Sequence, residues 1–163
     1  MSIQAIEEFK VEVPGGCVYV KKWNPENPIS KTPVILVHDS LGSVDLWKDF
    51  PLILSSKLSR CVVAYDRLGF GQSDARIDLP SIDFIEEEAN NYFHLIKKHL
   101  SLTDYILLGH SVGGGMSINI AARDSDCLAV VTLAAQAYVE DITVEAIKKA
   151  KKLFEHSGQT ERL

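Results

Sequence analysis

The chain has 163 residues, of which 46% are hydrophobic and 24% are charged. This length and composition are typical of one globular domain and exclude a disordered, collagenous or low-complexity protein. Its 17 basic residues against 22 acidic ones give a net charge of −5, so no basic surplus exists to neutralise phosphates and we expect no nucleic acid partner.

No part of the chain is expected to enter a membrane. The longest mostly apolar stretch, 127–139, contains Thr132 and Gln136 and is too short to span a bilayer. The first ten residues include Glu7 and Glu8 and lack the apolar core of a signal peptide. The three cysteines are widely spaced without a C-x-x-C pair, which is neither a disulfide framework nor a zinc site. We therefore expect a cytoplasmic protein.

Short apolar runs alternate with helical patterns along the chain. Two alternating stretches, 5–13 and 17–23, flank a Pro-Gly-Gly turn and predict an N-terminal β-hairpin. The pattern predicts further strands and helices, the strands over 33–37, 61–65, 105–108 and 128–134, the helices over 51–58, 84–100, 113–123 and 143–156. Continuous apolar strands that alternate with helices predict a mostly parallel sheet with helices on both faces. The fold class is α/β.

Charged residues are expected to stabilise the ends of the predicted helices. Asp49 precedes the helix at 51–58 as a candidate N-cap, and Pro51 fits the first turn. In the helix over 84–100, three glutamates at 86–88 lie near the start and basic residues at 97–99 lie at the end, which suits the helix dipole.

The last predicted strand, 128–134, is followed by no further strand in this sequence. It would form an exposed hydrophobic sheet edge, which soluble proteins normally cover or pair. We expect either that something pairs with this edge, by self-association or with a partner, or that the sequence is a fragment of a longer chain.

The sharpest chemical signal is the G-x-S-x-G motif at 109–113, which reads Gly-His-Ser-Val-Gly. It follows a predicted strand and opens a predicted helix, the setting that a nucleophile elbow requires. Ser111 is expected in a strained backbone conformation that presents its hydroxyl, while Gly109 and Gly113 allow strand and helix to cross closely. The helix N-terminus places the Val112 N–H beside a developing oxyanion. The alternative is a glycine-rich turn in which Ser111 only caps the helix.

Three motifs in this order resemble the α/β-hydrolase fold family. The apolar run 34–38 and the Asp-Ser-Leu-Gly-Ser at 39–43 resemble its strand and oxyanion loop, usually His-Gly-x-x-Gly. The stretch 66–73, Asp-Arg-Leu-Gly-Phe-Gly-Gln-Ser, resembles its D-x-x-G-x-G-x-S loop, and 109–114 resembles its nucleophile elbow. The match is nearest to small bacterial serine hydrolases of esterase or haloperoxidase type, which use no cofactor. The resemblance covers nearly the whole chain and implies an α/β-hydrolase core without its last strands.

The resemblance implies a role for each matching residue. Ser111 matches the nucleophile, and the backbone N–H groups of Ser40 and Val112 match the two donors of the oxyanion hole. Asp39 departs from the family's usual glycine. Its side chain would either crowd the oxyanion loop or add a carboxylate near the cleft.

Four other polar residues of these motifs are expected to be structural. Asp66 and Ser73 would hold their own loop by hydrogen bonds. His38 and His110 lie beneath the oxyanion loop and beside the elbow, from where an imidazole does not easily reach the Ser111 hydroxyl.

A serine needs a base, and the base needs an orienting carboxylate, in the family's order Ser, then Asp or Glu, then His. After Ser111 the only histidine is His156, which falls on a lysine-rich helix face and is better explained as a surface residue. Glu140 or Asp141 is a possible acid, or merely a loop or helix-cap carboxylate. The resemblance therefore implies that the base is absent from this chain. Some family members place the acid near Glu140 and Asp141, but most place it one strand later, which is beyond this sequence.

Two classes of function follow. The first is a serine hydrolase that cleaves an ester or related carbonyl substrate through an acyl-enzyme on Ser111. We expect an apolar acyl substrate and no metal or organic cofactor. An acyltransferase would form the same acyl-enzyme intermediate. The second is a non-catalytic, hydrolase-like binding module. A set of apolar residues near the end of the chain would line the substrate pocket or pack in the core: Tyr138, Val139, Ile142, Ile147 and Phe154.

Overall fold

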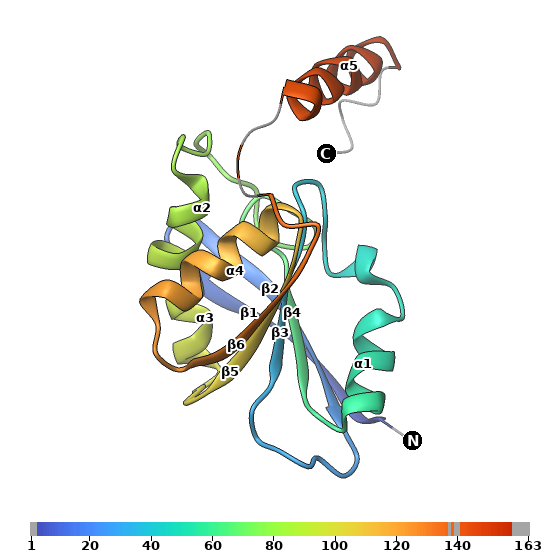
Figure 1. Cartoon of the computed structure of the whole chain (residues 1–163), viewed down its shortest axis with the longest axis vertical. Helices are drawn as coiled ribbons and strands as arrows, with labels where there is room; N and C mark the ends of the chain where they lie inside the picture. Colours follow the sequence, from blue (N-terminus) through green and yellow to red (C-terminus); the bar gives the residue numbers. More distant parts are fainter. Residues whose placement is uncertain (1–2, 137, 139–140, 158–163) are drawn as a thin grey trace.

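One six-stranded sheet organises the molecule (Figure 1). The computed structural model describes residues 3–136, 138 and 141–157. The strand order is β1-β2-β4-β3-β5-β6, with bounds β1 Ile3–Val13, β2 Gly16–Pro25, β3 Val34–Val37, β4 Val62–Tyr65, β5 Tyr105–His110 and β6 Cys127–Leu133. The hairpin β1–β2 and the pair β2–β4 are antiparallel, and the other pairs are parallel. The predicted α/β class, with its N-terminal hairpin and mostly parallel sheet, is confirmed.

Helices cover both faces of this sheet, as Figure 1 shows. Helix α1 lies on one face and the segments α2, η2, α3 and α4 on the other. Their bounds are α1 Phe50–Leu58, α2 Phe84–Glu87, the π-helical η2 Glu88–Phe93, α3 His94–His99 and α4 Val112–Arg123; a 3-10 turn, η1, covers Asp45–Trp47. Helix α5, Asp141–Ser157, is drawn apart from the sheet.

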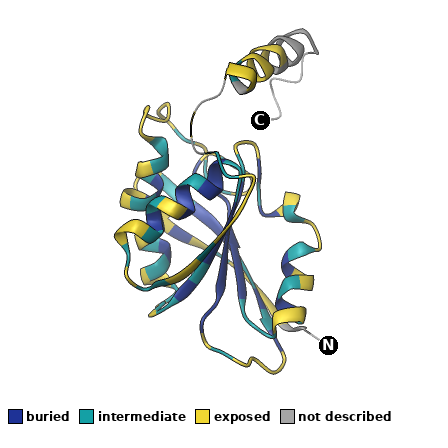
Figure 2. Cartoon of the chain, in the orientation of Figure 1, coloured by how far each residue is buried: buried dark blue, intermediate teal, exposed yellow. Residues whose placement is uncertain are grey.

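The core lies on the two faces of the central strands, which are dark blue in Figure 2. Along β3 the side chains alternate, so that Ile35 and Val37 join the cluster under α4, while Val34 and Leu36 join the cluster under α1. All four are buried because helices cover both faces of a parallel strand. This rigid centre holds the loops at the carboxyl ends of the strands.

The helix predicted over 84–100 forms, but it contains a π-helical segment and buries a charge. Its predicted face is correct, since Tyr92 and Ile96 are buried in the core. Glu88, which was expected to complement the helix dipole, also has a role that the sequence did not predict. Glu88 lies one turn from both Ile85 and Tyr92 on the inward face, is 4% exposed, and accepts a hydrogen bond from the Tyr65 hydroxyl at 2.8 Å.

Helix α1 starts as predicted but without the expected side-chain cap. Asp49 occupies the N-cap position with helical backbone angles, and its side chain makes no capping hydrogen bond. A residue that is already helical does not turn its carboxylate back to the first N–H groups, as a cap requires. Pro51 does lie in the first turn, as predicted.

Strand β6 forms the exposed apolar edge that was predicted. It pairs only with β5 among the described strands. Leu128, Val131 and Leu133 are 62%, 46% and 44% exposed. Pairing of this edge with a second copy or a partner remains a prediction.

The apolar residues near the end of the chain do not line a pocket where the structure describes them. Tyr138, Ile142 and Ile147 are strongly exposed, so the prediction that they line a pocket or pack in the core was wrong for these three. Val139 and the Phe154 side chain lie outside the described residues.

No described helix has both the length and the apolar character to cross a membrane.

Candidate active site

Ser111 lies at the turn between β5 and α4 with φ 53° and ψ −120°. Residues other than glycine rarely adopt a positive φ, so the strained backbone expected at Ser111 is confirmed. Three backbone hydrogen bonds hold the turn. The Ser111 N–H donates to the Leu133 carbonyl at 2.9 Å, and the Ser111 carbonyl accepts from the N–H groups of Gly114 at 2.9 Å and Gln136 at 3.1 Å.

Two glycines permit the close crossing of strand and helix beneath this turn. A Cβ atom at Gly109 would overlap the Gly113 carbonyl oxygen and lie 2.5 Å from the Ser117 hydroxyl. A Cβ atom at Gly113 would overlap the Val37 carbonyl oxygen. The Ser117 hydroxyl instead donates to the Gly113 carbonyl at 2.7 Å. The elbow therefore depends on the absence of side chains at both glycines.

Asp39 connects the oxyanion loop to the elbow. Its Oδ1 accepts from the Leu41 N–H at 3.1 Å, and its Oδ2 lies 3.1 Å from His110 Nδ1, 71 residues away in sequence. Its carbonyl accepts from the Arg67 guanidinium at 2.6 Å. Of the two outcomes expected for this residue, the structure shows an added carboxylate that binds the loop together. His110 is accordingly held by Asp39 at the base of the elbow.

His38 is a buried structural histidine, as expected. Its Nε2 accepts from the Arg67 backbone N–H at 3.0 Å, and its Nδ1 lies 2.8 Å from the Asp39 carbonyl. Because Nε2 accepts a hydrogen bond, it carries no proton. Because Nδ1 faces a carbonyl oxygen, it must donate, so the ring is neutral with its proton on Nδ1. Burial, aided by the Arg67 charge, lowers the pKa of His38 to about 3.

This lowered pKa predicts a pH-dependent stability. Between about pH 3 and the ordinary His pKa of 6.5, the unfolded chain binds a proton at His38 and the folded chain does not. The free energy of unfolding should therefore fall as the pH is lowered below 6.5, with His38 contributing about 1.4 kcal/mol per pH unit. Urea denaturation of His38→Gln should show a shallower pH dependence than the wild type. The exposed His94→Gln should follow the wild type, and parallel curves for both variants would contradict the prediction.

The loop at 66–73 is held by its own polar residues, as expected. Asp66 is buried and accepts from the N–H of Val44 at 2.5 Å and of Gln72 at 2.8 Å, while burial raises the pKa of its carboxyl. The Ser73 hydroxyl donates to the Asp66 carbonyl at 2.6 Å and accepts from the Tyr19 N–H at 2.8 Å. Because Val44 follows the oxyanion loop, Asp66 also fixes the end of that loop.

Two cavities flank the elbow. One, of about 210 Å³, is lined by both Ser40 and Val112, so the two predicted oxyanion residues come together around one space. The other, of about 340 Å³, is lined by Asp39, Trp47 and His110. The described part of the chain contains no group of three or more residues suited to a metal ion.

The remaining predicted residues are not brought to the elbow by anything that the structure describes. Asp141 is exposed at the start of α5. Glu140 and the His156 side chain lie outside the described residues. No hydrogen bond joins the Ser111 hydroxyl to a histidine within the described ranges.

Sequence reasoning missed Arg67 and Glu88, which are both buried and both line the 210 Å³ cavity. A signal for Glu88 was present, because it lies three residues after Ile85 and four before Tyr92 on the apolar helix face. Arg67 lies inside the second loop motif, but its burial depends on His38 and Asp39 from another strand end.

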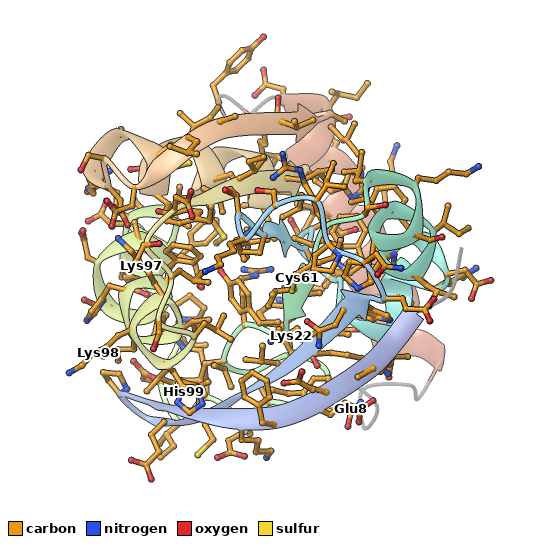
Figure 3. The ribbon with its side chains drawn as sticks, turned by 90° about the horizontal axis from the view of Figure 1, so that it is seen from below. Glu8, Lys22, Cys61, Lys97, Lys98 and His99 are labelled. Carbon is orange, nitrogen blue, oxygen red and sulfur yellow. The ribbon has the colours of Figure 1, made fainter. Side chains whose placement is uncertain are left out.

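A larger groove at the amino ends of the strands has no comparable chemistry. Figure 3 views this end and shows Lys22 and Cys61 close to its centre; both line the groove. Burial raises the pKa of the Cys61 thiol to about 11, so it is protonated at neutral pH and a poor nucleophile. The elbow therefore remains the better candidate site.

The comparisons with known proteins agree with this geometry. A family model described as the alpha/beta hydrolase fold matches residues 32–160. The chain belongs to the alpha/beta hydrolase fold family. Among solved structures, this α/β hydrolase resembles a proline iminopeptidase of Mycobacterium smegmatis with a TM-score of 0.69 and 25% identity, over 80% of this chain and 44% of the other. An alpha/beta hydrolase from Novosphingobium aromaticivorans has 17% identity and a TM-score of 0.72, over 91% of this chain and 50% of the other. At this identity the likeness shows the fold alone.

Curated relatives of this α/β hydrolase include both hydrolases and acyltransferases. It is 40% identical over 92 residues to the 1-acylglycerol-3-phosphate O-acyltransferase ABHD5 of Rattus norvegicus, a match over 54% of this chain and 24% of the relative. It is 32% identical over 88 residues to a proline iminopeptidase of Lactobacillus helveticus, over 54% of this chain and 30% of the relative. The chain thus matches about a quarter to a third of the length of these relatives.

Proposed function

We propose that this α/β hydrolase is a serine hydrolase that cleaves an ester or related carbonyl substrate through an acyl-enzyme on Ser111. The Ser111 oxygen attacks the carbonyl carbon while its proton passes to a base. The bond to the leaving group then breaks, and water later releases the acyl group. The single observation that carries the proposal is the strained backbone of Ser111 at the strand-to-helix turn.

The surroundings of Ser111 support the same role. Ser40 and Val112 line one cavity, so their N–H groups are the proposed donors to the oxyanion. Val112 also opens α4, whose N-terminal partial positive charge favours a developing negative charge. Backbone strain at such a turn costs free energy and is often kept at functional sites.

Neither His38 nor His110, the two histidines near the elbow, is proposed as the base. His38 is excluded as a base because its Nε2 already accepts a backbone N–H. His110 is bound to Asp39 at Nδ1 and supports the loop. We propose that another histidine and carboxylate complete the site in the active protein.

Acyl transfer is a second candidate, favoured by the 40% identity to an acyltransferase. The same acyl-enzyme would be captured by an alcohol acceptor in place of water. The ratio of transfer to hydrolysis product at increasing acceptor alcohol concentration distinguishes the two activities.

A fluorophosphonate probe tests the proposed nucleophile. With imidazole added as an external base in every sample, intact mass spectrometry should find one phosphonyl group on each wild-type chain and none on Ser111→Ala, because phosphonylation needs the serine oxygen. Ser101→Ala is a matched control, since Ser101 is exposed and also has a positive φ of 53° but lies away from the elbow. Ser101→Ala should be labelled like the wild type. Equal labelling of Ser111→Ala, or none of the wild type, would overturn the proposal.

A further inference from the structure

The 210 Å³ cavity beside Ser40 and Val112 contains a buried charge pair that is not in direct contact. Arg67 is 6% exposed and Glu88 is 4% exposed, and both line this cavity. No ion pair joins them among the described residues. Burial lowers the pKa of Arg67 and raises the pKa of Glu88, and the attraction between the two charges partly offsets each of these shifts. Two opposite charges around one cavity leave room for a ligand between them.

Each of the two groups has unused hydrogen-bonding capacity. The Arg67 Nε–H is buried and has no hydrogen-bond partner, which normally carries a free energy penalty. Glu88 uses Oε1 to accept from the Tyr65 hydroxyl at 2.8 Å. The Arg67 guanidinium stacks on Phe70 at 4.3 Å from the ring centroid, which fixes its plane. A ligand that completes both groups must therefore accept from Arg67 and donate to Glu88.

The charge balance selects a neutral ligand. An anion attracted by Arg67 would meet the Glu88 carboxylate, and a cation attracted by Glu88 would meet Arg67. The charge of the second arginine of the cavity, Arg76, is already paired with Glu87 and Asp78 at 3.4 Å each. Its Nε–H is buried without a hydrogen-bond partner, as is that of Arg67. An amide satisfies both charged groups, because its oxygen accepts and its N–H donates.

We propose that this cavity is a substrate subsite that binds a neutral amide group between Arg67 and Glu88. The aromatic rings of Phe70 and Phe84 also line it and provide flat apolar contact for a planar group. The inference rests on the proposed function, since Ser40 and Val112, the proposed oxyanion donors, line the same cavity. It adds the class of group that the substrate presents there.

Three probes matched in size and differing in charge test the subsite: benzamide, benzoate and benzylammonium. The Arg67 Nε–H signal of the full chain, followed by NMR, should shift saturably with benzamide. Benzamide should bind about tenfold more tightly than either ion, which corresponds to one unmatched buried charge. Tighter binding of either ion, or no shift with any probe, would overturn the proposal.

Substitution of Glu88 should reverse the preference. Glu88→Gln leaves the Arg67 charge without its counter-charge, so benzoate should become the tightest of the three probes. The control Glu86→Gln changes an exposed glutamate paired with Arg123 and should keep the wild-type order. Unchanged preference in Glu88→Gln would contradict the proposal. Ser111→Ala should bind benzamide normally, so failure of the subsite and failure of the nucleophile give different results.

Discussion

Gly113→Ala is expected to lower the free energy of unfolding by about 3 kcal/mol, the upper end of the cost of overpacking a core. The added Cβ would overlap the Val37 carbonyl oxygen and lie 2.5 Å from that of His38. Neither atom can move cheaply, because Val37 is paired with Gly109 in the sheet and His38 begins the oxyanion loop. The helix must therefore shift away from the strand, which also displaces Ser111. Chemical denaturation monitored by circular dichroism measures the loss.

Gly115→Ala is the matched control, two residues further along the same helix. Its added Cβ would lie 3.1 Å from the Gln136 carbonyl oxygen and 3.7 Å from Ile85 Cδ1, so only a small adjustment is needed. Alanine is also favoured over glycine in a helix by about 1 kcal/mol. Gly115→Ala should therefore retain wild-type stability within about 1 kcal/mol. Equal losses in the two variants would contradict the prediction, because the close crossing at Gly113 would then carry no special cost.

The elbow could be predicted because its determinants are local in sequence. The motif around Ser111, the strand before it and the helix after it all lie within one short segment, and the strained φ of 53° followed as expected. The continuous burial along 34–37 was equally local, since a parallel strand covered on both faces needs only apolar residues.

The polar contacts around the elbow could not be predicted because they join distant parts of the chain. Asp39 meets His110 across 71 residues, and Tyr65 meets Glu88 across 23 residues. A sequence pattern indicates that a carboxylate stands on an apolar helix face, but its partner depends on how the sheet and helix pack. Glu88 was therefore assigned to the start of the helix, where glutamates are favoured, although its partner lies in the core.

Imidazole in solution is expected to accelerate phosphonylation of Ser111 about tenfold. This factor is smaller than the one that a general base held in position by the protein supplies, because free imidazole is not oriented toward the serine. His38 and His110 are both held in other hydrogen bonds, so no described histidine is bound to the serine. The 340 Å³ cavity beside the elbow, lined by Asp39 and Trp47, can admit a free imidazole ring. The labelling rate should rise with imidazole concentration in the wild type.

Pyrazole and two variants separate this effect from its alternatives. Pyrazole has the same ring size but is a far weaker base, so it should leave the rate unchanged if imidazole acts by accepting the proton. Ser111→Ala should gain no adduct at any imidazole concentration. His156→Ala should behave as the wild type does, because the proposal assigns the base to another histidine. Rapid labelling that ignores imidazole and is lost in His156→Ala would instead identify His156 as the base. The nucleophile would then stand, and the assignment of the base would be overturned.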